Sequence, residues 1–215
     1  MSVIAVTSFI ANPGKMNEAQ SLLKEFVAIA KDFGAKGHVS ALVSGEIPGS
    51  LNVILEYTDP VAYGTALDKT NKDQGVLKFR ERAQQTQALT PTRASTFTEL
   101  PGLEVPYADL ASRNVINATL FQVRHGKQAQ SLERIKRSKA ITEKNGGKVR
   151  ALQAVTSDPF GLTAVTVYYT NFEAWGKAGI ALAADPEWQA FGAEIMGEHA
   201  SADFLRSPAH CLAML

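Results

Sequence analysis

Several side chains in the second half of the chain are of types that could bind and orient a small molecule. An arginine such as Arg134 can hold an oxyanion, and the hydroxyl of Ser138 and the amide of Asn171 can orient polar groups. The indole of Trp175 can stack on an aromatic ring, and the phenol of Tyr169 can donate a hydrogen bond to a substrate oxygen. These five residues form the candidate ligand-binding set.

The histidines and the cysteine do not form a metal site at the level of sequence. No two of His38, His125, His199 and His210 show the spacing of metal ligands, and the single cysteine, Cys211, excludes a cysteine-cluster site and an intrachain disulfide. His199, late in an expected helix, is the candidate for a general base or a haem ligand, with a structural or surface role as the alternative. No metal is expected.

Motifs for nucleotide binding or covalent catalysis are absent from the sequence. The Gly-Lys pairs at 14–15 and 126–127 lack the upstream glycine of a phosphate-binding loop, and no GxGxxG or GxSxG occurs. No cofactor is therefore expected.

The chain repeats itself at a fixed offset of 112 positions, as the Gly-Lys pairs at 14 and 126 illustrate. At this offset Val3-Ile4 aligns with Val115-Ile116, and Tyr57-Thr58 aligns with Tyr169-Thr170. A fixed period of this length indicates a repeated fold unit. We expect a first repeat at 1–100, a linker at 101–114 and a second repeat at 115–215.

Each repeat predicts the order βαββαβ. A strand at 3–10 or 115–123 runs into the Gly-Lys turn, and a helix follows at 15–33 or 127–145, ending at Gly34 or Gly146. Two strands, a helical region that breaks near Asp73 or Asp185, and a last strand complete the unit. The predicted fold class is α+β: two tandem ferredoxin-like units whose antiparallel sheets pack into one barrel with pseudo-twofold symmetry. A lone unit would leave an apolar sheet face in water, which pairing within one chain avoids.

The first helices of the two repeats differ on the face that should point inward. In the first repeat this face reads Leu22, Leu23, Phe26, Ala30 and Phe33, and in the second it reads Arg134, Ile135, Ser138, Thr142 and Asn145. Either the second helix is rotated to turn other residues inward, or a polar-lined cavity has opened beneath it.

The motifs resemble those of the dimeric α+β barrel superfamily. The resemblance rests on a strand followed by Pro13-Gly14-Lys15 at a helix start, on 172–175 (FEAW) and on 185–191 (DPEWQAF). That superfamily includes antibiotic-biosynthesis monooxygenase-like and NIPSNAP-like domains, and its activities range from cofactor-independent oxygenation to isomerisation and haem chemistry. Asn171 and Trp175 resemble an asparagine–tryptophan pair used by some monooxygenase-like members. The first repeat has Asp59 and Tyr63 in their place.

Composition indicates an ordinary globular protein and gives no sign of a nucleic acid or membrane partner. The net charge of +1 gives no support for nucleic acid binding, and no apolar run approaches the roughly 20 residues of a membrane span. Without a recognisable signal peptide, a cytoplasmic location is expected.

The sequence predicts a small-molecule-binding barrel whose partner is an apolar or aromatic molecule. The expected activity is cofactor-independent monooxygenation or isomerisation. The alternatives are a non-enzymatic ligand-binding or assembly protein and, third, a haem-binding protein. Further homo-oligomerisation is compatible with the fold, and whether the chain is an enzyme is left open.

Overall fold

The computed structural model describes residues 1–45, 47, 50–157, 161–197 and 200–214, with only the backbone of 204–214. The elements of the first repeat are β1 (Val3–Ala11), α1 (Met16–Asp32), β2 (Lys36–Ser44), β3 (Leu51–Tyr57), α2 (Pro60–Thr70), α3 (Gln74–Thr86) and β4 (Leu89–Glu99). A short helix, α4 (Tyr107–Leu110), lies in the linker. The second repeat contains β5 (Val115–Val123), α5 (Gln128–Lys144), β6 (Lys148–Thr156), β7 (Leu162–Tyr169), α6 (Phe172–Ala184), α7 (Pro186–Ile195) and β8 (Ala202–Met214).

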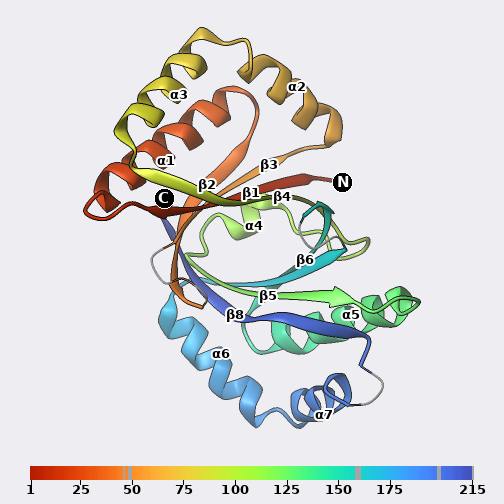
Figure 1. The fold of residues 1–215 in the computed structure, drawn as a ribbon. Coiled ribbons are helices and arrows are strands. Elements are labelled where there is room, and N and C mark those ends of the chain that lie inside the picture. The colour runs from red at the N-terminus through yellow and green to blue at the C-terminus, as the bar shows by residue number, and fades with distance from the viewer. Residues whose placement is uncertain (46, 48–49, 158–160, 198–199, 215) are drawn as a thin grey trace.

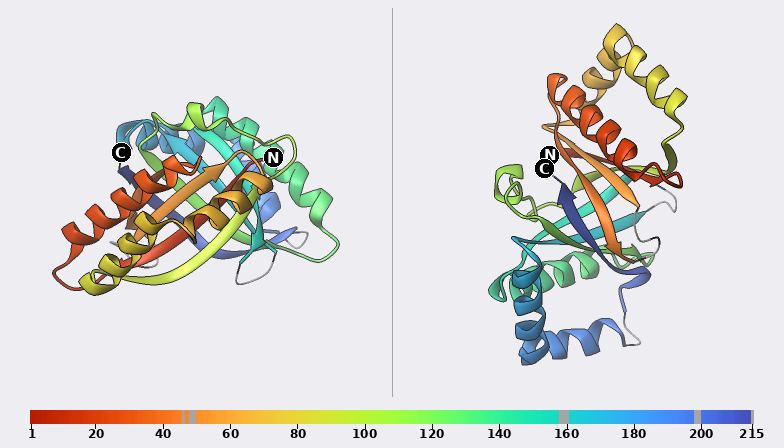
Figure 2. Two further views of the ribbon diagram at one scale, coloured as in Figure 1. Left: turned by 90° about the horizontal axis from the view of Figure 1, so that it is seen from above. Right: turned by 90° about the vertical axis from the view of Figure 1, so that its left-hand side faces the viewer.

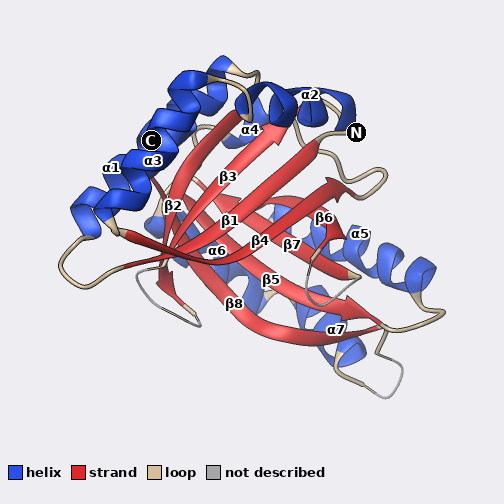
Figure 3. Cartoon of the chain, turned by 45° about the horizontal axis from the view of Figure 1, so that its top comes forward, coloured by secondary structure: helices blue, strands red, loops and turns tan. Residues whose placement is uncertain are grey.

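The strands form one closed antiparallel barrel in the order β1-β3-β2-β8-β5-β7-β6-β4. Each repeat contributes four neighbouring strands, and the barrel closes where β2 pairs with β8 and β4 pairs with β6. The helices of the two repeats cover opposite sides of the barrel (Figures 1 and 3). The predicted fold class, two ferredoxin-like units in one barrel, is confirmed.

Local sequence signals place the helix ends where the repeat predicts them. The side chains of Asp59, Asp73, Asn171 and Asp185 each accept a hydrogen bond from a backbone N–H in the first turn of α2, α3, α6 and α7. The predicted breaks near Asp73 and Asp185 are therefore helix starts. Beyond α1 and α5 the chain turns at Gly34 (φ 88°) and Gly146 (φ 96°), in the left-handed region that favours glycine.

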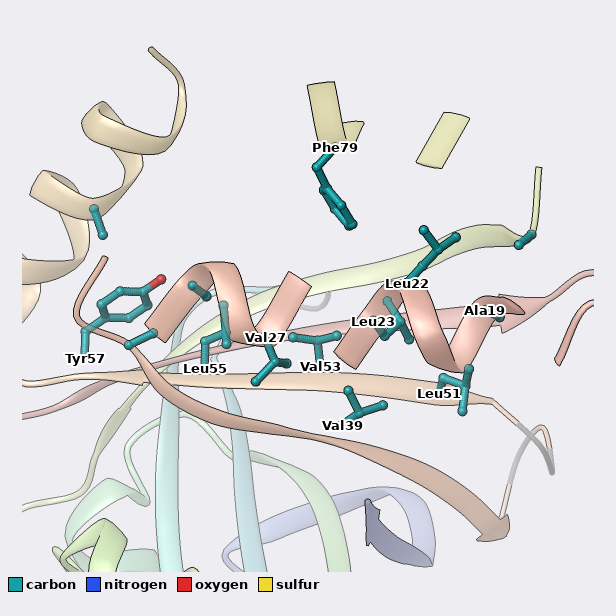
Figure 4. Close-up of a cluster of buried hydrophobic side chains, with 14 residues drawn as sticks. Ala19, Leu22, Leu23, Val27, Val39, Leu51, Val53, Leu55, Tyr57 and Phe79 are labelled. Atoms are coloured by element: carbon teal, nitrogen blue, oxygen red, sulfur yellow. The ribbon is translucent and has the colours of Figure 1, made fainter. Parts of the chain in front are cut away.

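The helix-facing side of the first repeat has a dry apolar core. Leu23 and Val27 of α1 pack on Val39, Val53 and Leu55 of the sheet, and Leu22 lies on the side of α1 that faces Phe79 (Figure 4). Phe79 of α3 closes the layer and stacks on Phe26 with ring centroids 6.0 Å apart. This burial of aliphatic and aromatic surface stabilises the unit.

The barrel interior is a second core, shared by both repeats. Ile4 and Phe97 from the first repeat pack against Leu152 and Leu162 from the second. At the other end Leu110 of α4 packs with Ile116 and Tyr168, so the linker covers one mouth of the barrel. Figure 2 shows α4 beside the strands, between the two helical layers. The linker therefore contributes to the core as well as joining the repeats.

Among the residues that the structure describes, every helix is too short or too polar to cross a membrane.

Candidate functional site

The helix α5 keeps the phase of α1, so it is not rotated. Its buried positions Ser131, Arg134, Ile135 and Thr142 correspond, at the offset of 112, to buried positions of α1 (Ala19, Leu22, Leu23 and Ala30). Polar side chains have thus replaced apolar ones on the same inward face. These polar side chains of α5 need hydrogen-bond partners, which the apolar side chains of α1 do not.

The polar groups of α5 find partners on or next to α7. The Nε of Arg134 donates to Glu194 Oε1 over 3.0 Å, and Arg137 donates to the other oxygen of the same carboxylate over 2.8 Å. The amide of Asn145 donates to Asp185 Oδ2 over 3.0 Å. Buried polar groups are tolerated when they are hydrogen-bonded in this way. Ser138 is half-buried beside them.

The other predicted ligand residues lie around α6. Asn171 Oδ1 accepts from the Ala174 N–H over 2.8 Å, so the asparagine caps the helix. Tyr169 is buried against Val115, with Trp175 packed on the same cluster, and burial raises the pKa of the Tyr169 phenol. The structure thus groups Tyr169 with Trp175 and pairs Arg134 with α7. Ligand binding by these five residues stays a prediction.

His199 lies outside the described residues, so its role as base or haem ligand also stays a prediction. Within the described ranges no group of three or more histidine, cysteine or acidic side chains could hold a metal ion.

We expect Asp185→Asn to lower the melting temperature at pH 7 by a few degrees, because the cap of α7 loses its charge. Hydrogen bonds from Asn145, the Glu187 N–H and Lys144 lower the pKa of Asp185 to about 2. Below about pH 4 the unfolded carboxyl protonates before the folded one, so the wild type loses this stabilisation as the pH falls towards 2. Thermal melts between pH 7 and 2 should show the difference in melting temperature between the wild type and Asp185→Asn becoming smaller as the pH falls.

Asp68→Asn, at an exposed position of α2, is the control and should track the wild type at every pH. A gap that is the same at pH 7 and pH 2 would contradict the assignment of the effect to the Asp185 carboxylate.

A groove large enough for a small molecule lies on the helix side of the first repeat. It runs between the end of α1 and the side of α2, is widely open to solvent and has a volume of about 550 Å³. Ligand pockets commonly measure about 300–1,000 Å³. Its lining residues are Phe33, Asp59, Val61, Ala62, Thr65, Ala66 and Lys69.

The groove combines an apolar wall with charged groups at its rim. Phe33, Ala62 and Ala66 could contact an apolar ring, and Lys69 could meet an acidic substituent. The Ala62 N–H and then the Thr58 hydroxyl lower the pKa of Asp59, so this groove residue stays an anion. The equivalent of Phe33 in the second repeat is Asn145, which bonds to Asp185.

A second cluster of chemical groups lies in the centre of the barrel. Arg150, 2% exposed, donates from Nε to Glu99 Oε1 over 2.9 Å and from Nη1 to Glu56 Oε2 over 2.7 Å. Glu99 also accepts from the Val105 N–H of the linker over 3.0 Å and from the Ser2 hydroxyl. Two carboxylates and one guanidinium are thus buried together with most of their hydrogen-bonding capacity satisfied.

Beside this cluster lies a cavity of about 20 Å³, which is room for one water molecule. Burial raises the pKa of the phenols Tyr107 and Tyr168 that face it. Burial, with a smaller contribution from Lys31, lowers the pKa of His38 to about 4. The lining residues are His38, Ile54, Glu56, Tyr107, Leu110, Ala111, Arg113, Arg150 and Tyr168.

The sequence reasoning missed this central cluster. The signal was present: Glu56 and Arg150 are charged residues that each stand between two apolar residues of a strand, at positions that alternate with helix-facing residues. The offset of 112 also places Arg150 at the position of His38, and Tyr168 at that of Glu56. Only the strand order of the barrel shows that Glu56 and Arg150 meet in its interior.

Comparisons with known proteins identify the fold alone. No protein-family model matches the chain, and no curated protein matches its sequence. A solved structure of a proposed monooxygenase from Fusobacterium nucleatum aligns with a TM-score of 0.64 at 12% identity, over 100% of this chain and 93% of that chain.

Two further solved structures share the architecture. An anthrone oxidase-like protein aligns with a TM-score of 0.60 at 12% identity, over 100% of this chain and 92% of that one. Chlorite dismutase from Candidatus Nitrospira defluvii, solved with imidazole, aligns with a TM-score of 0.55 at 9% identity, over 100% of this chain and 91% of its own. At these identities the likeness extends to the barrel and not to its chemistry.

Proposed function

We propose that the chain binds an apolar, aromatic small molecule in the groove between α1 and α2 of the first repeat. The observation that carries this proposal is the coincidence of ligand-sized space with an apolar wall at Phe33, Ala62 and Ala66 and a cation at Lys69. A ligand with fused rings and one acidic or hydroxyl oxygen fits this arrangement. Its rings would lie on the wall and its oxygen would point to the ammonium group.

The reaction we propose is cofactor-independent oxygenation of such a ligand. Two solved structures of the same fold are named a proposed monooxygenase and an anthrone oxidase-like protein, which supports testing this chemistry first. Anthrone is a suitable probe, because its oxidation by dioxygen gives anthraquinone and water in equal amounts. Isomerisation is the alternative reaction and would proceed without oxygen consumption.

A non-enzymatic binding role is the second candidate. It is favoured by the state of Asp59, because a carboxylate that caps α2 and has a lowered pKa is a weak proton acceptor. Calorimetry with anthrone and an oxygen electrode distinguish the two. Binding with oxygen uptake supports the oxygenase, and binding without turnover supports the binding protein.

We expect Thr65→Trp to weaken binding of anthrone by at least about tenfold, because the indole would fill the groove from its exposed wall. Titration calorimetry or retention of the ligand in native mass spectrometry measures the effect. The change lies on the exposed surface of α2, so the thermal stability should stay close to that of the wild type.

The matched control is Lys177→Trp, the equivalent exposed position on α6 of the second repeat. It should leave binding unchanged. If Lys177→Trp abolishes binding and Thr65→Trp does not, the ligand lies in the second repeat, where Asn171, Trp175 and Tyr169 are the candidates. If anthrone and related tricyclic compounds do not bind the wild type at all, the proposed ligand class is wrong.

A further inference from the structure

The buried charges at the barrel centre are divided between the repeats. Glu56 of β3 and Glu99 of β4 belong to the first repeat, and Arg150 of β6 belongs to the second. At each of the three positions, the other repeat has a different type of residue at the equivalent position, 112 residues away. Position 38, equivalent to 150, is histidine; position 168, equivalent to 56, is tyrosine; and position 211, equivalent to 99, is cysteine.

A barrel made from two identical repeats would therefore lack this complementarity. Two first repeats would bring together two copies of Glu56 and two of Glu99 with no arginine at the equivalent of position 150. Two second repeats would bring together two copies of Arg150 with no carboxylate at the three positions. Like charges in a buried site are strongly disfavoured, and only the mixed pairing supplies the two carboxylates with a cation that is charged at every pH.

The rest of the interface between the repeats distinguishes much less between mixed pairs and pairs of identical repeats. The closing edges, β2 with β8 and β4 with β6, are joined by backbone hydrogen bonds, which are independent of side-chain identity. The apolar interior is interchangeable in part, since Ile4 is equivalent to Ile116 and both are buried in it. Aliphatic packing alone tolerates such exchanges.

We propose that the cluster Glu56–Arg150–Glu99 is a recognition site through which the first repeat accepts only the second repeat as its partner. The interaction surface is the β4–β6 edge with the barrel centre behind it. The partner it fits is a sheet that carries a buried guanidinium at the position of Arg150. The cluster thereby prevents identical repeats of two chains from pairing into mixed oligomers, a case of specificity by charge exclusion.

The test starts from the folded full-length chain with a protease site inserted at Ser112, an exposed turn residue behind α4. The folded protein is cut, unfolded in urea and refolded by dilution, and native mass spectrometry counts the three dimers of the two halves and any unpaired halves. Unselective pairing would give about half mixed dimers. We expect the wild type to give mixed dimers in at least about tenfold excess over either identical pair.

Two variants give opposite signatures that loss of stability alone would not produce. Glu56→Gln with Glu99→Gln removes the repulsion between first repeats, so dimers of first halves should rise and the second halves that they leave over should appear as monomers. Arg150→Met should give the reverse, with dimers of second halves and leftover monomers of first halves. The control, Glu25→Gln with Arg82→Gln, removes an exposed ion pair inside the first repeat and should keep the wild-type distribution.

If one of the two variants fails to refold, the other is enough to test the proposal. Statistical pairing in the wild type would overturn the proposal, and so would an unchanged distribution in the refolded variants. Neither result bears on the groove between α1 and α2, because the assay contains no ligand.

Discussion

Replacing Arg150 by methionine is expected to lower the free energy of unfolding of the full-length chain by about 3–5 kcal/mol. The substitution preserves much of the side-chain volume but leaves Glu56 and Glu99 buried without their cation. Both glutamates are less than one-tenth exposed, so a water molecule in the small cavity beside them would replace hydrogen bonds of the guanidinium but not its charge. Urea denaturation at pH 7 measures the loss.

The companion variants decide whether the missing charge, and not the missing volume, causes this loss. Adding Glu56→Gln and Glu99→Gln to Arg150→Met should recover most of the stability, since neutral amides are far less costly to bury than carboxylates. Arg82→Met breaks an exposed ion pair with Glu25 and should cost less than about 1 kcal/mol. If the triple variant is as unstable as Arg150→Met alone, the explanation from uncompensated charge is wrong.

The fold could be predicted from the sequence because its evidence is periodic. The offset of 112 carries the glycine turns, the strand patterns and the helix caps together, and each signal is local in the chain. Asp73 and Asp185, for example, mark helix starts in both sequence and structure. Apolar residues on both faces of the first strand further require a cover for each face, which the barrel provides.

The chemical groups at the barrel centre could not be assembled in the same way. Arg150 and Glu56 are 94 positions apart and meet across the barrel interior, and not through neighbouring strands. Periodicity shows which face of a strand a residue occupies, but it does not show which residue of another strand lies opposite. The linker added a further contact, from the Val105 N–H to Glu99, that its prolines and glycine did not indicate.

The polar face of α5 illustrates a related limit. The sequence left two alternatives, a rotated helix or a cavity, because it could not show that Glu194 and Asp185 of the α7 region lie next to Arg134 and Asn145. The structure supplies a third arrangement, an unrotated helix whose polar side chains bond to a neighbouring helix. Replacing apolar contacts by ion pairs is possible there because α7 brings the complementary charge.

The two repeats have diverged in opposite directions on the two sides of the sheet. On the helix side the first repeat is apolar, with Phe26 and Phe33, where the second has Ser138 and Asn145. Inside the barrel the first repeat carries Ser8 hydrogen-bonded to Asn52, at positions where the second has Leu120 and Ala164. Duplication thus allowed each half to specialise while the backbone arrangement stayed the same.

His38 is expected to make the protein less stable in mild acid. Burial lowers its pKa from 6.5 to about 4 in the folded chain, so the unfolded chain takes up a proton first as the pH falls. The free energy of unfolding should therefore begin to fall below pH 6.5 and lose up to about 3 kcal/mol by pH 4, below which the contribution is constant. Urea denaturation at steps between pH 7 and 4 measures this slope.

The direction of the effect follows from the groups that surround the imidazole. Lys31 is the charge that adds to the lowering of its pKa, and the cavity that it lines also contains Arg113 and Arg150, with Glu56 as the opposing anion. His38→Gln should be less sensitive to acid than the wild type, because glutamine does not titrate, whereas His125→Gln, at an exposed turn, should follow the wild type. If His38→Gln and the wild type lose stability in parallel between pH 6.5 and 4, protonation of the barrel centre is not what limits folding in acid. The acidic side chains elsewhere in the chain would then carry the dependence.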